Sequence, residues 1–513
     1  MIAIGIQASP ANLQGEGVVR LPLPTQPSDH GSAIQAVQLN LNCRDEIIPI
    51  LRALQHLYQD APARQEILDL VGKDVNGHTS PKLGRKGLDY WSITVLAAVR
   101  LGCNFDYDKL QDLAEQHRNL RLIMGITDDK QDSKFDWRRI RDNVCLLRPQ
   151  TLQQINQVIV AVGHQQVPQA IQRVRGDTFV TETNIHYPTE SSLIGDGLRK
   201  VVTLAAALAT QHGVAGWRQH QHLLTKVKEI TREIGRVSRA KSKGANRLQS
   251  GYQRLLVLAE DLLQRAEQLF QTLSCQVEVA AIAGLKGTVA VDLRELQHFI
   301  DLTQKVCGTA RRRVLLGEAV ANEDKIFSIF EPHTELIKRG KQADPIQYGH
   351  RVLVIEDAAG FICHYQVVAN GVLDQELVVP VMTELQQRFG GKIERASFDR
   401  GFHTPENQEK LATLVAHPCL AKKGSKLGRV QQQEASVEFR QARQNHPGVE
   451  SAIGALQSGN GQERCRDKSQ VGYERYVGLG MLGRNLQVLG KLLLVQEEAG
   501  CEAAKSKRKK RSG

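Results

Sequence analysis

Three acidic residues are so placed along the sequence that they could bind metal ions together. Asp177 lies early in a segment rich in Val and Thr, Asp399 ends the segment 393–399, and Glu450 opens an apolar helical pattern. Carboxylate oxygens are the ligands that Mg²⁺ prefers, and two such ions about 3.5–4 Å apart can activate an attacking oxygen and stabilise a leaving one. The three residues therefore predict a two-metal site for phosphodiester cleavage and transfer, in which Mn²⁺ is expected to substitute for Mg²⁺.

Each carboxylate also has an ordinary explanation. An Asp in a strand is more often simply exposed than catalytic, and an Asp-x-Gly after a strand is often only a turn. A Glu in the first turn of a helix often does no more than interact favourably with the helix dipole. The metal-site hypothesis therefore depends on the elements that bring the three residues together.

These elements are predicted from periodicity and turn signals. Val174–Ile185 has the composition of a strand. Strand signals then cease for more than a hundred residues. The later patterns predict a hairpin of strands over 350–356 and 361–368, a helix over 380–389, a strand over 393–399, a helix capped by Thr404, a short strand over 415–421, and helices over 447–456 and 476–495.

With residues 191–325 set aside, the order is strand, hairpin, helix, strand, helix, short strand, helix. This order predicts an α/β fold with an RNase H-like catalytic core made of 170–190 and 326–495. A compact domain rarely contains so long a loop without structure, so 191–325 is expected to form a helical insertion. The useful positions for metal ligands in such a core are its first strand, the end of its fourth strand and a following helix.

The N-terminal region, 46–165, is predicted to be all helical and to bind DNA. Short helices joined by tight turns are typical of helix-turn-helix units, although the same pattern fits any small helical bundle. The expected helices cover Trp91–Leu101, 107–117, 119–124 and 134–147, with a further one capped by Thr151 and ending near Val162. Residues 1–45, rich in Gly, Pro, Gln and Ser, are expected to form a flexible leader, and 496–513 a basic tail.

The charge of the chain favours a nucleic-acid partner. The 513 residues have a formal net charge of +12. Residues 505–511 of the tail carry six positive charges and no negative one, and 12 minus 6 leaves six on the rest of the chain, so these residues do not account for the whole excess. Solvated surface charge and ion pairing are the alternatives. The predicted DNA contacts are Arg138, Arg139 and Arg141 in the N-terminal region, Lys226, Lys228, Arg232, Arg236, Arg239, Lys241 and Lys243 in the insertion, and Arg400 and His403 beside Asp399.

Cysteine usage and hydropathy predict a cytoplasmic protein. Nine cysteines are scattered along the sequence without a CxxC pair or a Cys/His cluster at zinc-ligand spacing, as in proteins of a reducing compartment. The N-terminus lacks the basic region of a secretory signal. No stretch reaches the roughly 18 apolar residues that a membrane span needs, so no membrane partner is expected.

Several sequence blocks resemble a known family. They are RGDTFVTETNIHYPTESSLIGDGLR at 175–199, FEPHTELIKRGK at 330–341 with YGHRVLV at 348–354, SFDRGFHTPEN at 397–407 and HPGVESAIGALQ at 446–457. They are similar to blocks of bacterial insertion-sequence DDE transposases of the ISNCY type. The resemblance implies an enzyme that binds the terminal inverted repeats of its element and catalyses strand cleavage and transfer. It implies that Asp177, Asp399 and Glu450 are the catalytic metal ligands.

The same resemblance implies double-stranded DNA as partner, both element ends and target, a homo-oligomer in the active complex, and association with the bacterial nucleoid. The chain departs from related transposases around the glutamate, where Tyr, Arg and Lys are common and Arg443, His446 and Gln457 stand here. Two alternatives stay open: a catalytically inactive DNA-binding protein derived from a transposase, and another RNase H-like DNA nuclease.

Overall fold

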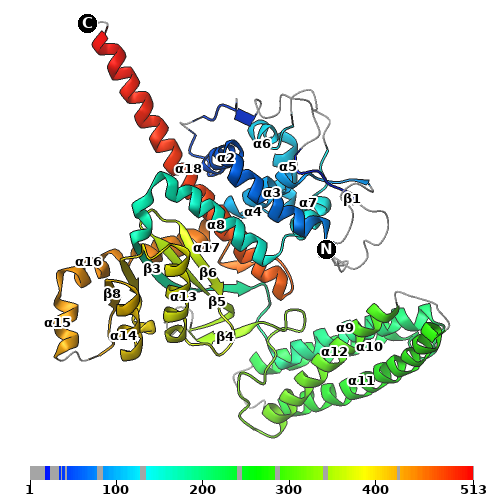
Figure 1. Ribbon diagram of the computed structural model, residues 1–513. Helices are drawn as coiled ribbons and strands as arrows, with labels where there is room; N and C mark the ends of the chain where they lie inside the picture. The colour runs from blue at the N-terminus through cyan, green and yellow to red at the C-terminus, as the bar shows by residue number, and fades with distance from the viewer. Residues whose placement is uncertain are drawn as a thin grey trace. The chain divides into compact units, whose positions relative to one another are not determined.

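The protein is a mixed α/β molecule (Figure 1). The computed structural model describes residues 18–23, 34–35, 37–40, 43–77, 85–126, 134–239, 245–282, 289–338, 345–424 and 428–511. The chain divides into two compact units, one made of Met1–Glu182 with His350–Gly513 and the other of Thr183–Gly349. The segment joining the halves of the first unit is thus the second unit.

A mixed sheet organises the first unit. Its strands within the described residues are β3 (Arg173–Thr183), β5 (Ile346–Asp357), β6 (Ile362–Val367), β7 (Arg395–Phe398), β8 (His417–Leu420) and β9 (Arg464–Cys465). A further strand, β4 (Glu335–Lys338), lies in the second unit and pairs there with the first residues of β5. β3 is hydrogen-bonded to β5 and to β7, and β7 to β8; β7 runs parallel to both β3 and β8. β6 and β4 are antiparallel to β5. The strands and the hairpin predicted from composition are therefore present.

The helices before the sheet pack together with the last helix of the chain. They are α2 (Ile47–Gln59), α3 (Ala61–Asn76), α4 (Tyr90–Gly102), α5 (Tyr107–Gln116), α6 (Arg118–Ile123), α7 (Trp137–Val144), α8 (Pro149–Gln166) and α18 (Gln470–Arg511). Every residue of α4 is buried. α18 contacts α2, α4 and α8, so the helical region and the sheet form one unit with one large hydrophobic core.

Glycines let α18 approach its neighbours closely. A Cβ at Gly483 would collide with the backbone of Gly102 in α4, and one at Gly490 with the backbone of Pro49 in α2. Only hydrogen fits at such contacts between helix backbones. The glycines of the segment 480–490 therefore mark where helices cross.

Two predicted helix starts are wrong. The helix expected to be capped by Thr151 is α8, which begins at Pro149, because proline in the first turn lacks only a donor that the helix leaves unpaired. The helix expected from Pro380 is α13 (Asp374–Arg388), which contains Pro380 in its interior. Pro380 is exposed, so its ring meets solvent and not a packed neighbour.

The remaining helices of the first unit surround the carboxyl-terminal part of the sheet. They are α14 (Pro405–Leu414), α15 (Arg429–Ala435), α16 (Val437–Asn445) and α17 (Gly448–Gly459), with short 3₁₀ segments at Pro168–Gln172 and Arg400–Phe402. The hydroxyl of Thr404 accepts a hydrogen bond from the backbone N–H of Asn407 at 3.0 Å, so the predicted cap of α14 is confirmed.

Part of segment 1–45 is packed and does not behave as a loose leader where it is described. Ile34 is fully buried, and the side-chain amide of Gln55 in α2 donates to the carbonyls of Ile34 and Val37 at 2.9 and 3.0 Å. β1 (Val18–Val19) pairs with β2 (Arg85–Lys86). The composition of the segment did not show these contacts, since their partners lie far along the chain.

The second unit is a bundle of four helices, visible in green in Figure 1. They are α9 (Glu190–Gln211), α10 (His220–Arg239), α11 (Ala245–Ile282) and α12 (Val289–Ala310), followed by a π-helical turn at Arg311–Leu315. Their apolar faces form a separate core. The helical stretch expected over 191–325 is therefore present, and the second unit also contains β4. In the part of the chain that the structure describes, no helix has the length and apolar character to cross a membrane.

Candidate active site

Strand pairing places Asp177 beside Asp399. β3 and β7 are parallel, with Arg175 opposite Ser397 and Gly176 opposite Phe398, so the next pair in this register is Asp177 with Asp399. Asp399 follows the last residue of β7 and keeps an extended backbone, with φ −69° and ψ 166°. Neighbouring strands are about 4.8 Å apart. The two carboxylates are therefore lateral neighbours.

Gly176 determines the face on which these carboxylates lie. A side chain at Gly176 would collide with Ile355 and Phe398, so this position faces the packed side of the sheet. Successive residues of a strand point to opposite faces. Asp177 therefore lies on the other face, where Arg175 also lies. Asp177 is half-buried and Asp399 is exposed.

Arg175 connects this face to the beginning of α17. Its Nε donates to the buried carboxylate of Glu356 at 2.6 Å, and its Nη1 donates to the carbonyl of Asn445 at 2.9 Å. Any side chain at Gly448 would overlap the guanidinium of Arg175. The first residue of α17 therefore lies directly over Arg175.

The other end of α17 lies near a later residue of β3. The Gln457 side chain donates to the carbonyl of Val180 at 3.4 Å. α17 consequently follows β3 in the same direction, from Arg175 to Val180. Glu450, two residues after Gly448, is in the stretch of helix that passes Asp177, and its side chain is exposed.

His446 lies between the second and third carboxylates. Its Nδ1 is 3.3 Å from the hydroxyl of Ser397, which shares a strand face with Asp399. Burial lowers the pKa of His446, while the negative charges of Asp399 and Glu450 oppose that shift. One imidazole thus senses both carboxylates, in agreement with the strand and helix geometry. The sequence showed His446 only as a departure from the related pattern; its spacing of four residues from Glu450 was the available signal.

Arg400 and His403 follow Asp399 on a short turn. Phe402 anchors the turn: it is buried and packs against Phe398 with ring centroids 5.4 Å apart. Arg400 is exposed and His403 is half-buried. Both residues thus follow Asp399 on an anchored turn, and their contact with DNA stays a prediction.

A cavity of about 140 Å³ lies next to the carboxylate face, toward the beginnings of β3 and β7. Arg173, Arg175 and Arg395 line it together with Ser397 and Asn445. Asp357 also lines the cavity and Arg175 is paired with Glu356, so the positive charge of the three guanidinium groups is partly compensated. Arginines so placed are suited to phosphate oxygens.

The other predicted DNA contacts lie on helices outside this site. Arg138 and Arg139 on α7 are exposed, and the Arg138 guanidinium lies 4.6 Å from the Trp137 ring centroid. Arg141 pairs with the neighbouring Asp142 at 2.8 Å, which weakens the case for a phosphate contact there.

On α10, Lys226, Lys228, Arg232, Arg236 and Arg239 are all exposed, whereas Lys241 and Lys243 lie outside the described residues. Spacings of four, four and three residues place Lys228, Arg232, Arg236 and Arg239 on one helical face. Beside this face, an open groove of about 630 Å³ lies between α10 and α11, lined by Arg236, Arg247 and Arg254 among others. Glu233 pairs with Arg254 at 2.6 Å, so part of the groove's positive charge is compensated.

No protein-family model matches the sequence, and neither a curated protein nor a solved structure is found to be similar to it. The functional argument therefore depends on the residues and their geometry.

Proposed function

We propose that the protein is a DNA transposase of the DDE type, in which Asp177, Asp399 and Glu450 bind two Mg²⁺ ions for strand cleavage and strand transfer. The observation that carries the proposal is the register of β3 with β7. It makes Asp177 and Asp399 neighbours on the sheet face along which α17 brings Glu450.

The sheet topology supports an RNase H-like core. Counting the core strands β3, β5, β6, β7 and β8 in chain order, their order across the sheet is third, second, first, fourth, fifth. The second and third form an antiparallel hairpin, and the first, fourth and fifth are parallel. This order and these directions are those expected of an RNase H-like sheet, in which the first and fourth strands would supply two of the carboxylates.

The three carboxylates are suited to magnesium. All offer oxygen only, and their exposed or half-buried positions leave room for the waters that Mg²⁺ retains. Bound ions would supply an activated oxygen nucleophile and charge neutralisation at the leaving oxygen. The chain itself orients the carboxylates, through Arg175 for α17 and through Ser397 and His446 for the Asp399 side.

Basic residues complete the proposed enzyme. Arg400, His403 and the arginines of the small cavity would hold the scissile strand, and the α10 face and the α7 arginines would contact the backbone of element ends or target. Such contacts bind any sequence, so recognition of terminal repeats needs further contacts to bases. A homo-oligomeric active complex remains part of the proposal.

The decisive experiment uses purified protein and the DNA that flanks its gene, which would contain the terminal repeats. Asp399→Ala is expected to abolish cleavage in Mg²⁺ while binding to terminal DNA stays within about twofold, because the metal ligand is lost and the basic surfaces remain. Glu394→Gln, an exposed carboxylate just before β7, is the control and should cleave normally. Full cleavage by Asp399→Ala would overturn the assignment.

One observation favours a second candidate, an inactive DNA-binding derivative of a transposase. Gln457 stands where related enzymes have lysine, and its side chain bonds to the backbone of Val180. It therefore carries no positive charge toward DNA. This candidate predicts that the wild-type protein binds terminal DNA tightly and shows no cleavage in either Mg²⁺ or Mn²⁺.

A further inference from the structure

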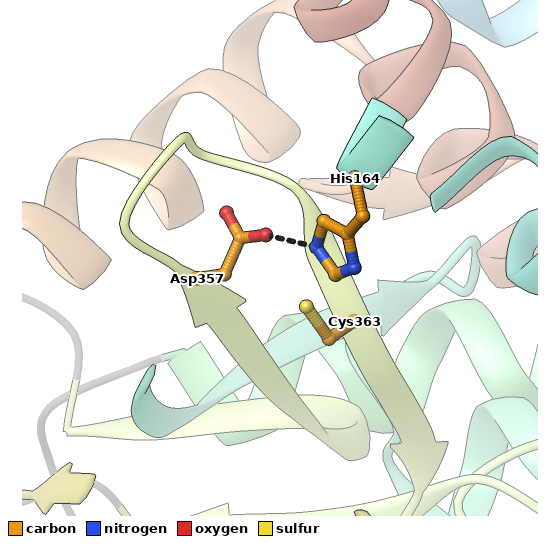
Figure 2. A group of neighbouring side chains, drawn as sticks. All are labelled: His164, Asp357 and Cys363. Atoms are coloured by element: carbon orange, nitrogen blue, oxygen red, sulfur yellow. Dashed lines mark hydrogen bonds and ion pairs between the residues drawn. The ribbon is translucent and has the colours of Figure 1, made fainter. Parts of the chain in front are cut away.

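A buried group of three potential metal ligands lies apart from the carboxylate face. It consists of His164 near the end of α8, Asp357 at the end of β5 and Cys363 in β6 (Figure 2). The Nε2 atom of His164 is 2.7 Å from Oδ2 of Asp357, and one ligand atom from each residue lies within 4.8 Å of the others. Asp357 and Cys363 are six residues apart (363 minus 357), but His164 lies 193 residues before Asp357, which is why no zinc-ligand spacing was visible in the sequence.

The hairpin holds the aspartate ready for a ligand. Oδ1 of Asp357 accepts hydrogen bonds from the backbone N–H groups of Ala359 and Phe361 at 2.9 and 3.0 Å. Gly360 permits this tight turn with φ +93°. These bonds leave Oδ2 directed at His164, on the side where the Cys363 sulfur lies in Figure 2.

The surroundings are nearly dry. Asp357 is 1% exposed and Cys363 is 4% exposed. The rings of Phe361 and Phe389 pack against His164, with centroids 6.1 and 5.4 Å from the imidazole. In such a place a carboxylate and a thiolate side by side are unfavourable as two uncompensated anions.

Arg388 lies beside the group but is engaged by other acceptors. The Arg388 guanidinium donates to the backbone carbonyl of Cys363 at 2.8 Å and lies within 3.9 Å of Glu384, so it is shared with another carboxylate. A divalent cation between the three ligand atoms would compensate both anionic side chains at once.

We propose that His164, Asp357 and Cys363 bind one zinc ion, or another divalent metal that prefers nitrogen and sulfur ligands to oxygen alone. Imidazole and thiolate select zinc over magnesium, so this site is chemically distinct from the three-carboxylate face. A water molecule would be the fourth ligand, and the His164 side chain, which is 13% exposed, is the member of the group nearest to solvent. The inference does not depend on the proposed function.

Small side-chain movements would complete the coordination. Zinc bond lengths place tetrahedral ligand atoms about 3.3–3.6 Å apart. The His164–Asp357 contact must therefore open slightly, and the Cys363 sulfur must move inward by roughly 1 Å. On binding, the S–H bond of Cys363 breaks, its proton passes to solvent and a zinc–sulfur bond forms. The proton between Nε2 of His164 and Oδ2 of Asp357 also leaves the contact, and the imidazole binds in its neutral form with its proton on Nδ1. The bound ion would join α8 of the helical region to the β5–β6 hairpin.

Cobalt titration of the full, metal-free chain tests this site. The wild-type protein is expected to bind one Co²⁺ with a thiolate-to-metal absorption band, and Zn²⁺ should displace it and raise the melting temperature. Cys363→Ser should lose the band and weaken binding at least about 100-fold, since even a residue that only supports a ligand commonly contributes 10–100-fold. Cys419→Ser, which changes another buried thiol of the same unit, should retain both.

Two further measurements keep the outcome decisive. His164→Gln should weaken binding as Cys363→Ser does, and serves if the serine variant does not fold. X-ray absorption at the zinc edge of the wild-type protein should show one sulfur with nitrogen and oxygen ligands. Absence of a cobalt–thiolate band in the wild type, unchanged affinity in a folded ligand variant, or a zinc shell without sulfur would each overturn the proposal.

Discussion

The carboxylates become neighbours through backbone pairing, and small or polar residues near them determine how closely they assemble. Gly176 and Gly448 have no side chain, and a Cβ at either position would collide with its neighbours and push β3 or α17 away. Arg175 fills the space over Gly448 and pairs with Glu356, whose side chain is only 3% exposed. His446 then occupies the gap between Asp399 and Glu450. At the residue scale, the geometry of the site therefore depends on these supporting residues as well as on the three carboxylates.

His446→Ala is expected to reduce cleavage about tenfold and to raise the Mg²⁺ concentration needed for half-maximal cleavage. The imidazole connects α17 to Ser397, so its loss lets Glu450 move relative to Asp399. Precise placement of catalytic groups is worth factors of this size or more. The magnesium dependence of initial cleavage rates measures the effect.

Ser397→Ala provides the matching test, because it removes the partner of the same hydrogen bond. The double variant should cleave little more slowly than His446→Ala alone, since coupled residues are non-additive. Independent, multiplying effects of the two changes would argue against this role for His446.

At the element scale, local signals predicted what local interactions determine. The Thr404–Pro405 start of α14 follows from capping and from proline in the first turn, and the strands at 395–398 and 417–420 lie within the segments 393–399 and 415–421 that were predicted as strands. The starts of α8 and α13 were not predicted correctly. A proline can lie in the first turn of a helix, as Pro149 does in α8, or at an exposed interior position, as Pro380 does in α13. The β3–β7 register was beyond the sequence as well: it joins residues more than 200 positions apart, and tertiary packing selects it.

Arg100 of α4 and Asp467 form a buried ion pair. Removing the side chain of one partner alone is expected to lower the free energy of unfolding strongly. The side chains are 3% and 11% exposed, and the Arg100 guanidinium also lies 4.1 Å from the Tyr107 ring centroid. Asp467→Ala leaves a buried charge without its partner and should cost about 3–5 kcal/mol in urea unfolding. Asp112→Ala, which breaks an exposed pair with Lys109, should cost less than about 1 kcal/mol. Equal losses in both variants would contradict this account.

The close contact between α18 and α4 at Gly483 gives a second prediction about stability. Gly483→Ala should destabilise the protein by about 1–3 kcal/mol, since the new methyl group overlaps the backbone of Gly102. Gly454→Ala in α17 is the control, because nothing lies within 4 Å of a Cβ at that position. It should be neutral or stabilising by about 0.5–1 kcal/mol, owing to the helix propensity of alanine. Opposite signs for the two variants in thermal or urea unfolding are the expected result.

At the scale of the whole molecule, the proposed catalytic site and the proposed α10 contact with DNA lie in different units. The first contains the carboxylate face and the His164 group, and the second contains the basic face of α10. Composition and net charge predicted a polyanionic partner for the chain as a whole. Which cations remain available for it could not be read from the sequence, because pairs such as Arg141–Asp142 and Arg254–Glu233 depend on the fold.

The α10 face is therefore expected to contribute to DNA binding through phosphate contacts alone. Changing Lys228, Arg232 and Arg236 to Gln should weaken binding to specific and unrelated duplexes by similar factors. Each lost contact releases about one counterion fewer, so the slope of log K against log salt should become shallower by about 0.9 per contact. Changing the exposed Lys109 and Lys410, which pair with Asp112 and Glu406, should leave the slope unchanged. An unchanged slope in the α10 variant would mean that this face is a solvated surface, and that the DNA contacts lie around Arg400 and the three arginines of the small cavity.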